Sequence, residues 1–265
     1  MELISLKYAI FVIVLLVLYY CFPKKYRWYV LLAGSMAYYV IICKWYVLFI
    51  IFTICTTYGS TIWIDKLLKE QNAIVKSHKE DWDRQTRKEY KEKGRKKRVA
   101  VMLFALLCNF GILAFLKYIP YAGELGLLLP LGISFYTFQS MGYVMDVYRE
   151  IVEPEKNFLK VALFVSFFPQ IIQGPIAIYD KLAGQLYEGH SLRLENLQKG
   201  ALLVLWGVMK KLVIADRAVN IINFVMDKPM DFSGTYVFFA AVVYALQLYA
   251  DFSGGIDIVR GIAEM

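Results

Sequence analysis

Long apolar runs recur along the chain, and short polar segments separate them. A helix needs about 20 consecutive apolar residues to cross ~30 Å of hydrocarbon. The runs are continuous and do not alternate with polar residues, which indicates helices and not the strands of a barrel. We therefore expect an all-α, polytopic membrane helix bundle. Spans are expected at about 8–22, 28–42, 45–64, 99–118, 127–145, 200–214 and 236–249.

One apolar stretch, SFFPQIIQGPI at 166–176, is interrupted. Its prolines lack a backbone donor and its glycine weakens a helix. At membrane depth, a broken backbone is tolerated only where protein buries it or where it lines a wet cavity. We expect a re-entrant segment that lines a path, with candidate residues Pro169, Gln170, Gln173, Gly174 and Pro175. Two alternatives stay open: a loop at the membrane surface, and glutamines that only satisfy freed backbone groups.

A second polar group lies in the apolar region near the end of the sequence and contains Asp251, Ser253 and Asp257. Carboxylates at membrane depth usually face a bundle interior and mark function. We expect residues 253–255 to break the helix and Asp251 to cap the helix that follows. The apolar positions after 256 resemble half a span, so we expect the polypeptide to end within an element. The adjacent Lys210 and Lys211 are expected to reach the inner membrane interface.

Composition agrees with a membrane protein and charge predicts its orientation. Hydrophobic residues make up 59% of the 265 residues, against about 45–50% in soluble proteins. Segment 65–98 holds thirteen basic and seven acidic residues and carries most of the net charge of +8. Basic loops stay cytoplasmic, so we expect this loop inside and the N-terminus outside a plasma membrane. The segment predicts a solvated surface helix or, alternatively, a docking site for acidic lipid or an acidic partner; no nucleic-acid partner is expected.

Cysteine and histidine give no sign of a metal site. The four cysteines lie in or beside apolar runs without metal-ligand spacing, so we interpret them as small apolar fillers. The two histidines, His78 and His190, lie in polar segments and are expected at the surface. The first apolar run lacks a small-residue cleavage site and is interpreted as a span, not as a removed signal.

Three blocks of sequence carry a resemblance to a known family. The first is LLPLGISFYTFQSMGYVMDVYR at 128–149. The second is SFFPQIIQGPI with the downstream MKKLVIADR at 209–217, and the third is LQLYADFSGGIDIVRGIA at 246–263. In order and spacing these blocks resemble the membrane-bound O-acyltransferase (MBOAT) family, in its alginate O-acetylase and D-alanyl-transfer branch. This chain resembles only the N-terminal part of the proteins of that family.

The resemblance implies transfer of an acyl group, in particular acetyl, from a cytosolic thioester to hydroxyls of an exported polysaccharide. The implied donor is acetyl coenzyme A or an acyl-carrier protein, with no bound cofactor. The implied acceptor is the polysaccharide, which receives the acyl group directly or through an extracytoplasmic partner transferase. Membrane lipid is the other implied partner. The family's catalytic histidine, in a motif resembling W-x-x-W-H, would lie beyond Met265, so we expect this chain to be inactive alone.

Two other functions are compatible with the residues. Broken helices and buried acids also occur in transporters, although we find no repeated halves here. A degenerate acyltransferase that serves as a non-catalytic membrane scaffold for a partner enzyme is the other alternative.

Overall fold

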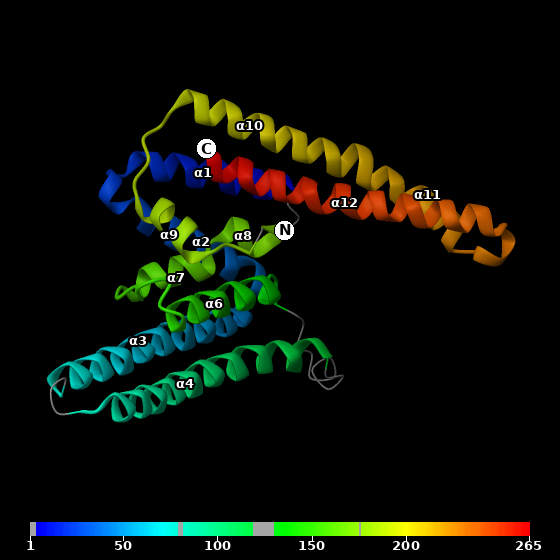
Figure 1. Ribbon diagram of the computed structural model, residues 1–265. Coiled ribbons are helices and arrows are strands. Elements are labelled where there is room, and N and C mark those ends of the chain that lie inside the picture. The colour runs from blue at the N-terminus through cyan, green and yellow to red at the C-terminus, as the bar shows by residue number, and fades with distance from the viewer. Residues whose placement is uncertain (1–3, 79–81, 119–129, 175) are drawn as a thin grey trace. The chain divides into compact units, whose positions relative to one another are not determined.

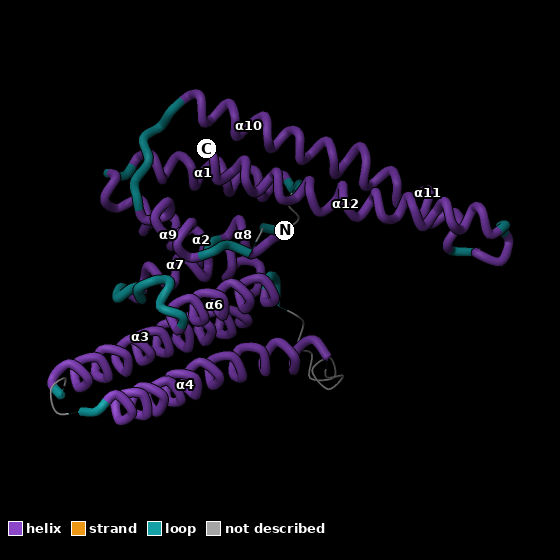
Figure 2. The backbone as a smooth tube through the Cα atoms, in the orientation of Figure 1, coloured by secondary structure: helices purple, strands orange, loops and turns teal. Residues whose placement is uncertain are grey.

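The structure is a computed structural model that describes residues 4–78, 82–118, 130–174 and 176–265 (Figure 1). Within these residues the chain is helical and contains no strand, as the tube in Figure 2 shows. The predicted all-α class is therefore confirmed. The helices are α1 Leu6–Cys21, α2 Arg27–Cys43, α3 Val47–Ser77, α4 Arg84–Tyr118, α6 Ile133–Tyr148, α7 Phe158–Ser166, α8 Phe168–Gln173, α9 Tyr179–Tyr187, α10 Leu194–Met209, α11 Asp216–Met226 and α12 Gly234–Glu264, with the π-helical turn η3 at Lys210–Ala215 and short 3-10 turns at Lys24–Tyr26, Lys44–Tyr46 and Pro229–Asp231. The predicted start of a span at 127–129 and Pro175 lie outside the described residues.

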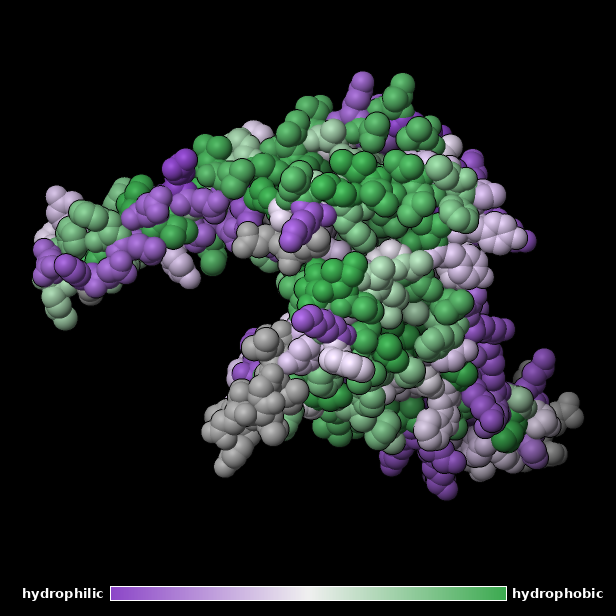
Figure 3. All heavy atoms as spheres, turned by 180° about the vertical axis from the view of Figure 1, so that it is seen from behind, coloured by the Kyte–Doolittle hydropathy of each residue, from purple (hydrophilic) through white to green (hydrophobic). Residues whose placement is uncertain are grey.

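Three helical stretches are long and apolar enough to cross a membrane: Lys24–Ser77, Arg84–Tyr118 and Gly234–Glu264. The first contains α2 and α3, which meet at a turn where Lys44 takes a φ of 49°. Shorter apolar helices cover Leu6–Cys21 and Phe158–Gln173. Exposed apolar side chains cover much of the face drawn in Figure 3, as expected for a surface that meets lipid. The chain is thus an all-α membrane protein, while the number of crossings and their direction stay predictions.

Contacts divide the chain into two compact units, and each is described by itself. The first unit contains residues 1–27, 172–175 and 190–265; the second contains 28–171 and 176–189. The sequence analysis did not predict this division, because each unit combines segments that are distant in the sequence. The prediction of a single MBOAT-like domain over 1–265 stays a prediction.

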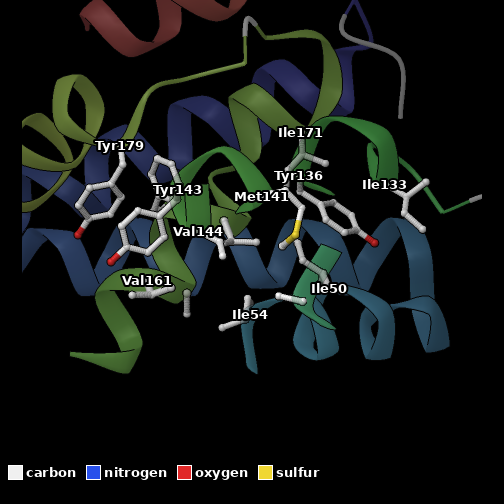
Figure 4. Close-up of a cluster of buried hydrophobic side chains, with 14 of the residues drawn as sticks. Ile50, Ile54, Ile133, Tyr136, Met141, Tyr143, Val144, Val161, Ile171 and Tyr179 are labelled. Carbon is white, nitrogen blue, oxygen red and sulfur yellow. The ribbon is translucent and has the colours of Figure 1, made fainter. Parts of the chain in front are cut away.

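The core of the second unit forms where α6 packs on α3 and α7. Tyr136, Met141 and Val144 of α6 are buried together with Ile50 and Ile54 of α3 (Figure 4). Before α6, Gly132 has a φ of +70°, and a side chain there would collide with the backbone of Ile171. The positive φ and the lack of space both disfavour a residue with a Cβ at this position. Gly132 therefore allows the start of α6 to lie against Ile171 of α8.

Segment 65–98 does not form a helix that lies on the surface. Instead, α3 continues to Ser77 and α4 begins at Arg84, so the segment extends both helices. At roughly 1.5 Å per residue, the 31 residues of α3 and 35 of α4 extend about 46 and 52 Å. Both exceed the ~30 Å of a hydrocarbon core, because the glutamates and lysines spaced three or four apart continue the helix into water. The cytoplasmic location of this segment stays a prediction.

In the first unit, α10, η3 and α11 follow one another without a break and pack antiparallel on α12 (Figure 1). Glycines occupy the closest approaches: Gly200 faces Gly261, and Gly207 faces Gly254. A Cβ on Gly254 would lie 2.8 Å from the carbonyl oxygen of Gly207. Small residues at such a spacing let two helices pack backbone to backbone in a membrane. We call this pair of contacts the glycine seam.

The predicted helix break at 253–255 is wrong. Helix α12 runs without interruption from Gly234 to Glu264, so Asp251 is not a helix cap and no new element begins after 256. Gly254 and Gly255 are both buried. The two glycines allow close packing of neighbouring residues and do not end the helix.

Candidate functional site

The interrupted stretch is a pair of short helices with a break between them. Helix α7 ends at Ser166, Phe167 takes non-helical angles (φ −57°, ψ 107°), and α8 begins at Phe168. Pro169 is the second residue of α8, where a missing donor costs no intrahelical hydrogen bond. The predicted interruption is confirmed, and it falls at Phe167 and not at a proline.

Two side chains replace the backbone hydrogen bond that the break removes. An unbroken helix would join the Phe168 N–H to the Phe164 carbonyl. Here the Gln139 amide donates to the Phe164 carbonyl at 2.8 Å, and the Phe168 N–H donates to Ser35 Oγ at 3.2 Å. Broken backbone at membrane depth requires such partners. Neither Gln139 nor Ser35 was predicted as such a partner: Ser35 is a lone polar residue in an apolar run, while Gln139 lies beside Ser140 and near Thr137.

The first half of the stretch is buried by protein, while its depth in the membrane stays a prediction. Phe168 and Ile171 are each 2% exposed and Gln170 is 9% exposed. Gln170 Oε1 is buried and has no hydrogen-bond partner among the described residues. An amide oxygen in that condition is costly; the role of Gln170 as a lining residue stays a prediction.

Gln173, the last residue of α8, contacts the third sequence block. Its side-chain amide lies directly over Gly255 of α12, in the space where a Cβ would be. A glycine at 255 is therefore what allows the amide to lie against the α12 backbone. This contact, within the first unit, joins the predicted lining residue Gln173 to the segment with Asp251, Ser253 and Asp257.

Two lysine–aspartate pairs lie beside this contact. Lys210 Nζ is 2.5 Å from Asp257 Oδ2, and Lys211 forms the other pair with Asp251. The four side chains are between 14% and 33% exposed. The sequence predicted that Lys210 and Lys211 reach the inner interface, but it did not predict that they pair with aspartates. Paired charges are the form in which ionised side chains persist in an apolar setting.

Helix geometry explains how adjacent lysines find partners on one helix. Gly254 lies at the glycine seam, and the two aspartates are three residues before and three residues after it. They lie on the two sides of the close contact, so each lysine reaches one of them. Both lysines begin the π-helical turn at Lys210–Ala215, a wider turn that often occurs at functional sites. The sequence pattern did not predict this turn.

The arrangement is a compact polar group inside an apolar hairpin. Ser253 Oγ is buried without a hydrogen-bond partner among the described residues, and Gly255, which the Gln173 amide covers, lies two residues further along α12. The two ion pairs hold equal positive and negative charge. The site can therefore hydrogen-bond an uncharged polar group, such as a carbonyl, without presenting it with an uncompensated charge.

Neither histidine belongs to this group. His78 and His190 are both exposed, as expected. The His78 ring stacks on Trp82 with centroids 4.9 Å apart, and the His190 N–H donates to the Tyr19 hydroxyl at 3.3 Å. Among the described residues, no cluster of three or more histidine, cysteine or acidic side chains could hold a metal ion.

Comparison with known proteins places this chain beside O-acetyltransferases. No protein-family model matches it. It is 32% identical over 199 residues to the peptidoglycan O-acetyltransferase of Helicobacter pylori, which covers 61% of this chain and 38% of that protein. It is 36% identical over 140 residues to a "probable alginate O-acetylase AlgI" of Pseudomonas syringae, covering 52% of this chain and 26% of the relative. A protein of the same name in Azotobacter vinelandii is 33% identical over 165 residues, or 62% of this chain and 31% of its own.

These matches span well under half the length of each of the three relatives. Several relatives match this chain at similar identity over 140 to 199 residues. These matches are much longer than the three short sequence blocks. Over the matched part, the comparisons confirm the resemblance of this chain to the membrane-bound O-acyltransferase family that its three blocks predict.

Proposed function

We propose that this chain forms the acyl path of an O-acyltransferase that acetylates hydroxyls of an exported or cell-surface polysaccharide. Relatives named for alginate and peptidoglycan O-acetylation support the reaction class. The observation that carries the proposal is the Gln173 amide on Gly255, beside the pairs of Lys210 with Asp257 and Lys211 with Asp251. It joins two sequence blocks into one polar group at a break in an apolar segment.

In this proposal, the acyl group passes along α12 where Gln173, at the end of α8, lies against it. The Gln173 amide donates a hydrogen bond to the acyl carbonyl, because a carbonyl in an apolar setting needs a donor. The two ion pairs keep the hairpin polar without presenting a net charge. Further lining residues are proposed from the first unit, namely Gly174, Asp251, Ser253 and Asp257. Pro169 and Gln170 of the second unit, and Pro175, which lies outside the described residues, stay candidates from the sequence alone.

The proposed donor is a cytosolic thioester, either acetyl coenzyme A or an acyl-carrier protein, and no bound cofactor takes part. The proposed acceptor is a polysaccharide outside the plasma membrane, reached directly or through an extracytoplasmic partner transferase. Removal of the acceptor hydroxyl proton needs a general base, which contributes about 10²–10⁴-fold. We assign that role to neither His78 nor His190, because both lie at exposed turns away from helix interiors.

Photocrosslinking tests the acyl path without requiring turnover. Membranes containing the chain are incubated with coenzyme A thioesterified to a short photoreactive acyl group, irradiated and digested, and the labelled peptides are sequenced by mass spectrometry. We expect adducts in 168–174 and 250–257. Gln173→Leu should lower labelling about tenfold, because the variant loses one hydrogen bond to the acyl carbonyl in an apolar setting. Gln198→Leu, an exposed glutamine on α10, is the matched control.

Other outcomes would favour the other functions. Co-purification of a partner enzyme without any thioester labelling would indicate a scaffold. Substrate uptake into vesicles that Asp251→Asn abolishes would indicate a transporter. Labelling that Gln173→Leu and Gln198→Leu leave equally strong would contradict the proposed path.

A further inference from the structure

A groove lies between the helical extensions of α3 and α4, within the second unit. Its volume is about 540 Å³, and it is lined by Leu68, Gln71, Asn72, Lys88, Lys91, Glu92, Arg95, Arg98 and Glu150. Hydrophilic side chains gather on this end of the α3–α4 hairpin in Figure 3. The volume is in the range of small-molecule sites, about 300–1,000 Å³. Neither the proposed acyl path nor the three sequence blocks account for this groove.

Helical spacing gives the groove its charge. Lys88, Lys91, Arg95 and Arg98 follow one another at intervals of three or four residues, so they share one face of α4. That face is turned toward α3, which contributes Leu68, Gln71 and Asn72 to the groove. Four basic side chains meet two acidic ones, Glu92 and Glu150, which leaves a net charge of +2. Glu92 also lies 3.8 Å from Lys96, which is not a lining residue.

Arg98 is held in place at the base of the groove. Its Nη1 donates to Gln71 Oε1 at 2.6 Å, and Gln71 fits over Gly94, where a Cβ would lie 2.6 Å from the Gln71 side chain. Glu150 is more distant, with 3.9 Å between Arg98 Nη2 and Glu150 Oε1. Arg98 is 9% exposed, and its buried Nε has no hydrogen-bond partner among the described residues.

A buried guanidinium with an unused donor, under three further cations, is suited to an anion with several oxygens. Arginine binds phosphate with two parallel hydrogen bonds, while lysines add charge around it. Arg98 comes directly before the apolar run that starts at 99, so the groove lies where α4 passes from polar to apolar sequence. A ligand there can be reached from water and from the boundary of a membrane.

We propose that this groove binds the phosphate group of a phosphorylated ligand. The chemistry is the same whether the phosphate belongs to a membrane-lipid headgroup or to a soluble phosphorylated molecule. The lining amide of Asn72 hydrogen-bonds the part of the ligand next to the phosphate, while Gln71 holds Arg98. The proposal does not depend on the acyl path, because it uses none of the residues assigned to that path.

The test compares two charge-matched variants of the full chain in nanodiscs. In one, Lys91→Gln is combined with Arg95→Gln, which line the groove. In the other, Lys93→Gln is combined with Lys97→Gln, on the same helix but outside the groove. All four residues are exposed, so folding should be unaffected. Titration calorimetry measures binding of inorganic pyrophosphate in phosphatidylcholine discs, and native mass spectrometry measures retained phosphatidic acid in mixed discs.

We expect binding in at least one of the two arms. The groove variant should bind at least about tenfold more weakly, because it loses two charge-assisted contacts, while the control variant should stay within twofold of the unmodified chain. Binding of pyrophosphate identifies a soluble source, and retention of phosphatidic acid alone identifies a lipid source. Absence of binding in both arms, or an equal loss in both variants, overturns the proposal.

Discussion

Gln139 and Ser35 show how single polar residues make a break in a buried helix possible. Gln139 donates to the Phe164 carbonyl, and Ser35 accepts from the Phe168 N–H. In an unbroken helix these two backbone groups would bond to each other. Each is buried, at 4% and 0% exposure. Without them, two backbone groups would lie unpaired in an apolar interior, at a cost comparable to the hydrogen bonds themselves.

Replacing Gln139 with leucine should therefore lower stability more than its loss of one side-chain hydrogen bond suggests. The Phe164 carbonyl would remain buried without its partner, which costs about 1–3 kcal/mol. Denaturant unfolding in detergent, followed by circular dichroism, measures the effect. Gln198→Leu on the exposed side of α10 serves as the control and should change stability by less than about 0.5 kcal/mol. Equal stability of the two variants would show that the break needs no such partner.

At this scale, the sequence predicts which residues are unusual but not their partners. Gln170, Gln173, Asp251 and Asp257 stand out because polar groups are rare in apolar runs. Their partners depend on which helices pack together, and the lysines of the pairs lie 40 and 47 residues before their aspartates. No local pattern records that pairing.

Among the elements, the α10–α12 hairpin shows where sequence reasoning fails. Two adjacent glycines after a serine predict a break, yet α12 stays helical through Gly254 and Gly255. The gain from close packing along the glycine seam outweighs the weak helix propensity of glycine, about 1 kcal/mol per residue. In contrast, an interruption within 166–176 was predicted from its prolines and glycine, although the break itself falls at Phe167, two residues before Pro169.

A pair of glycine-to-alanine variants separates packing from propensity. Gly207→Ala places a Cβ 2.8 Å from the Ile258 side chain and against the Gly254 backbone, so we expect a lower melting temperature. Gly111→Ala in α4 meets nothing within 4 Å and should be neutral or stabilising by up to about 1 kcal/mol. Thermal unfolding of both variants in the same detergent gives the comparison. A melting temperature for Gly207→Ala at or above that of Gly111→Ala would rule out the seam as a packing contact.

For the whole molecule, hydropathy predicted the all-α class and the approximate helix positions, since both follow from the apolar runs. It did not predict that α3 and α4 extend to Ser77 and back to Arg84. Charged residues at helical spacing leave two possibilities, a separate surface helix or a continuation of the spans, and only packing between α3 and α4 decides between them. The division into two units was also hidden, because it follows contacts between segments distant in sequence.

The predicted orientation can be tested by labelling single cysteines. In a background without the four native cysteines, Trp45→Cys and His78→Cys place thiols at two exposed turns. We expect a membrane-impermeant maleimide to label Trp45→Cys in intact cells, and His78→Cys only after the membrane is opened, because basic segments stay cytoplasmic. Labelling after opening serves as the control for both thiols. Labelling of His78→Cys in intact cells would reverse the assignment.

The glycine seam also limits how the hairpin can move. Its contacts recur every seven residues, at Gly200 and Gly207 on one helix and at Gly254 and Gly261 on the other. Sliding by one residue would bring a side chain against a backbone, and the next register with glycine at a contact lies about 10 Å away along the axis. The two helices are therefore locked against small sliding motions. Rotation of side chains such as Gln173 over Gly255 needs no change in this register, so it is the motion that the seam leaves open at the proposed path.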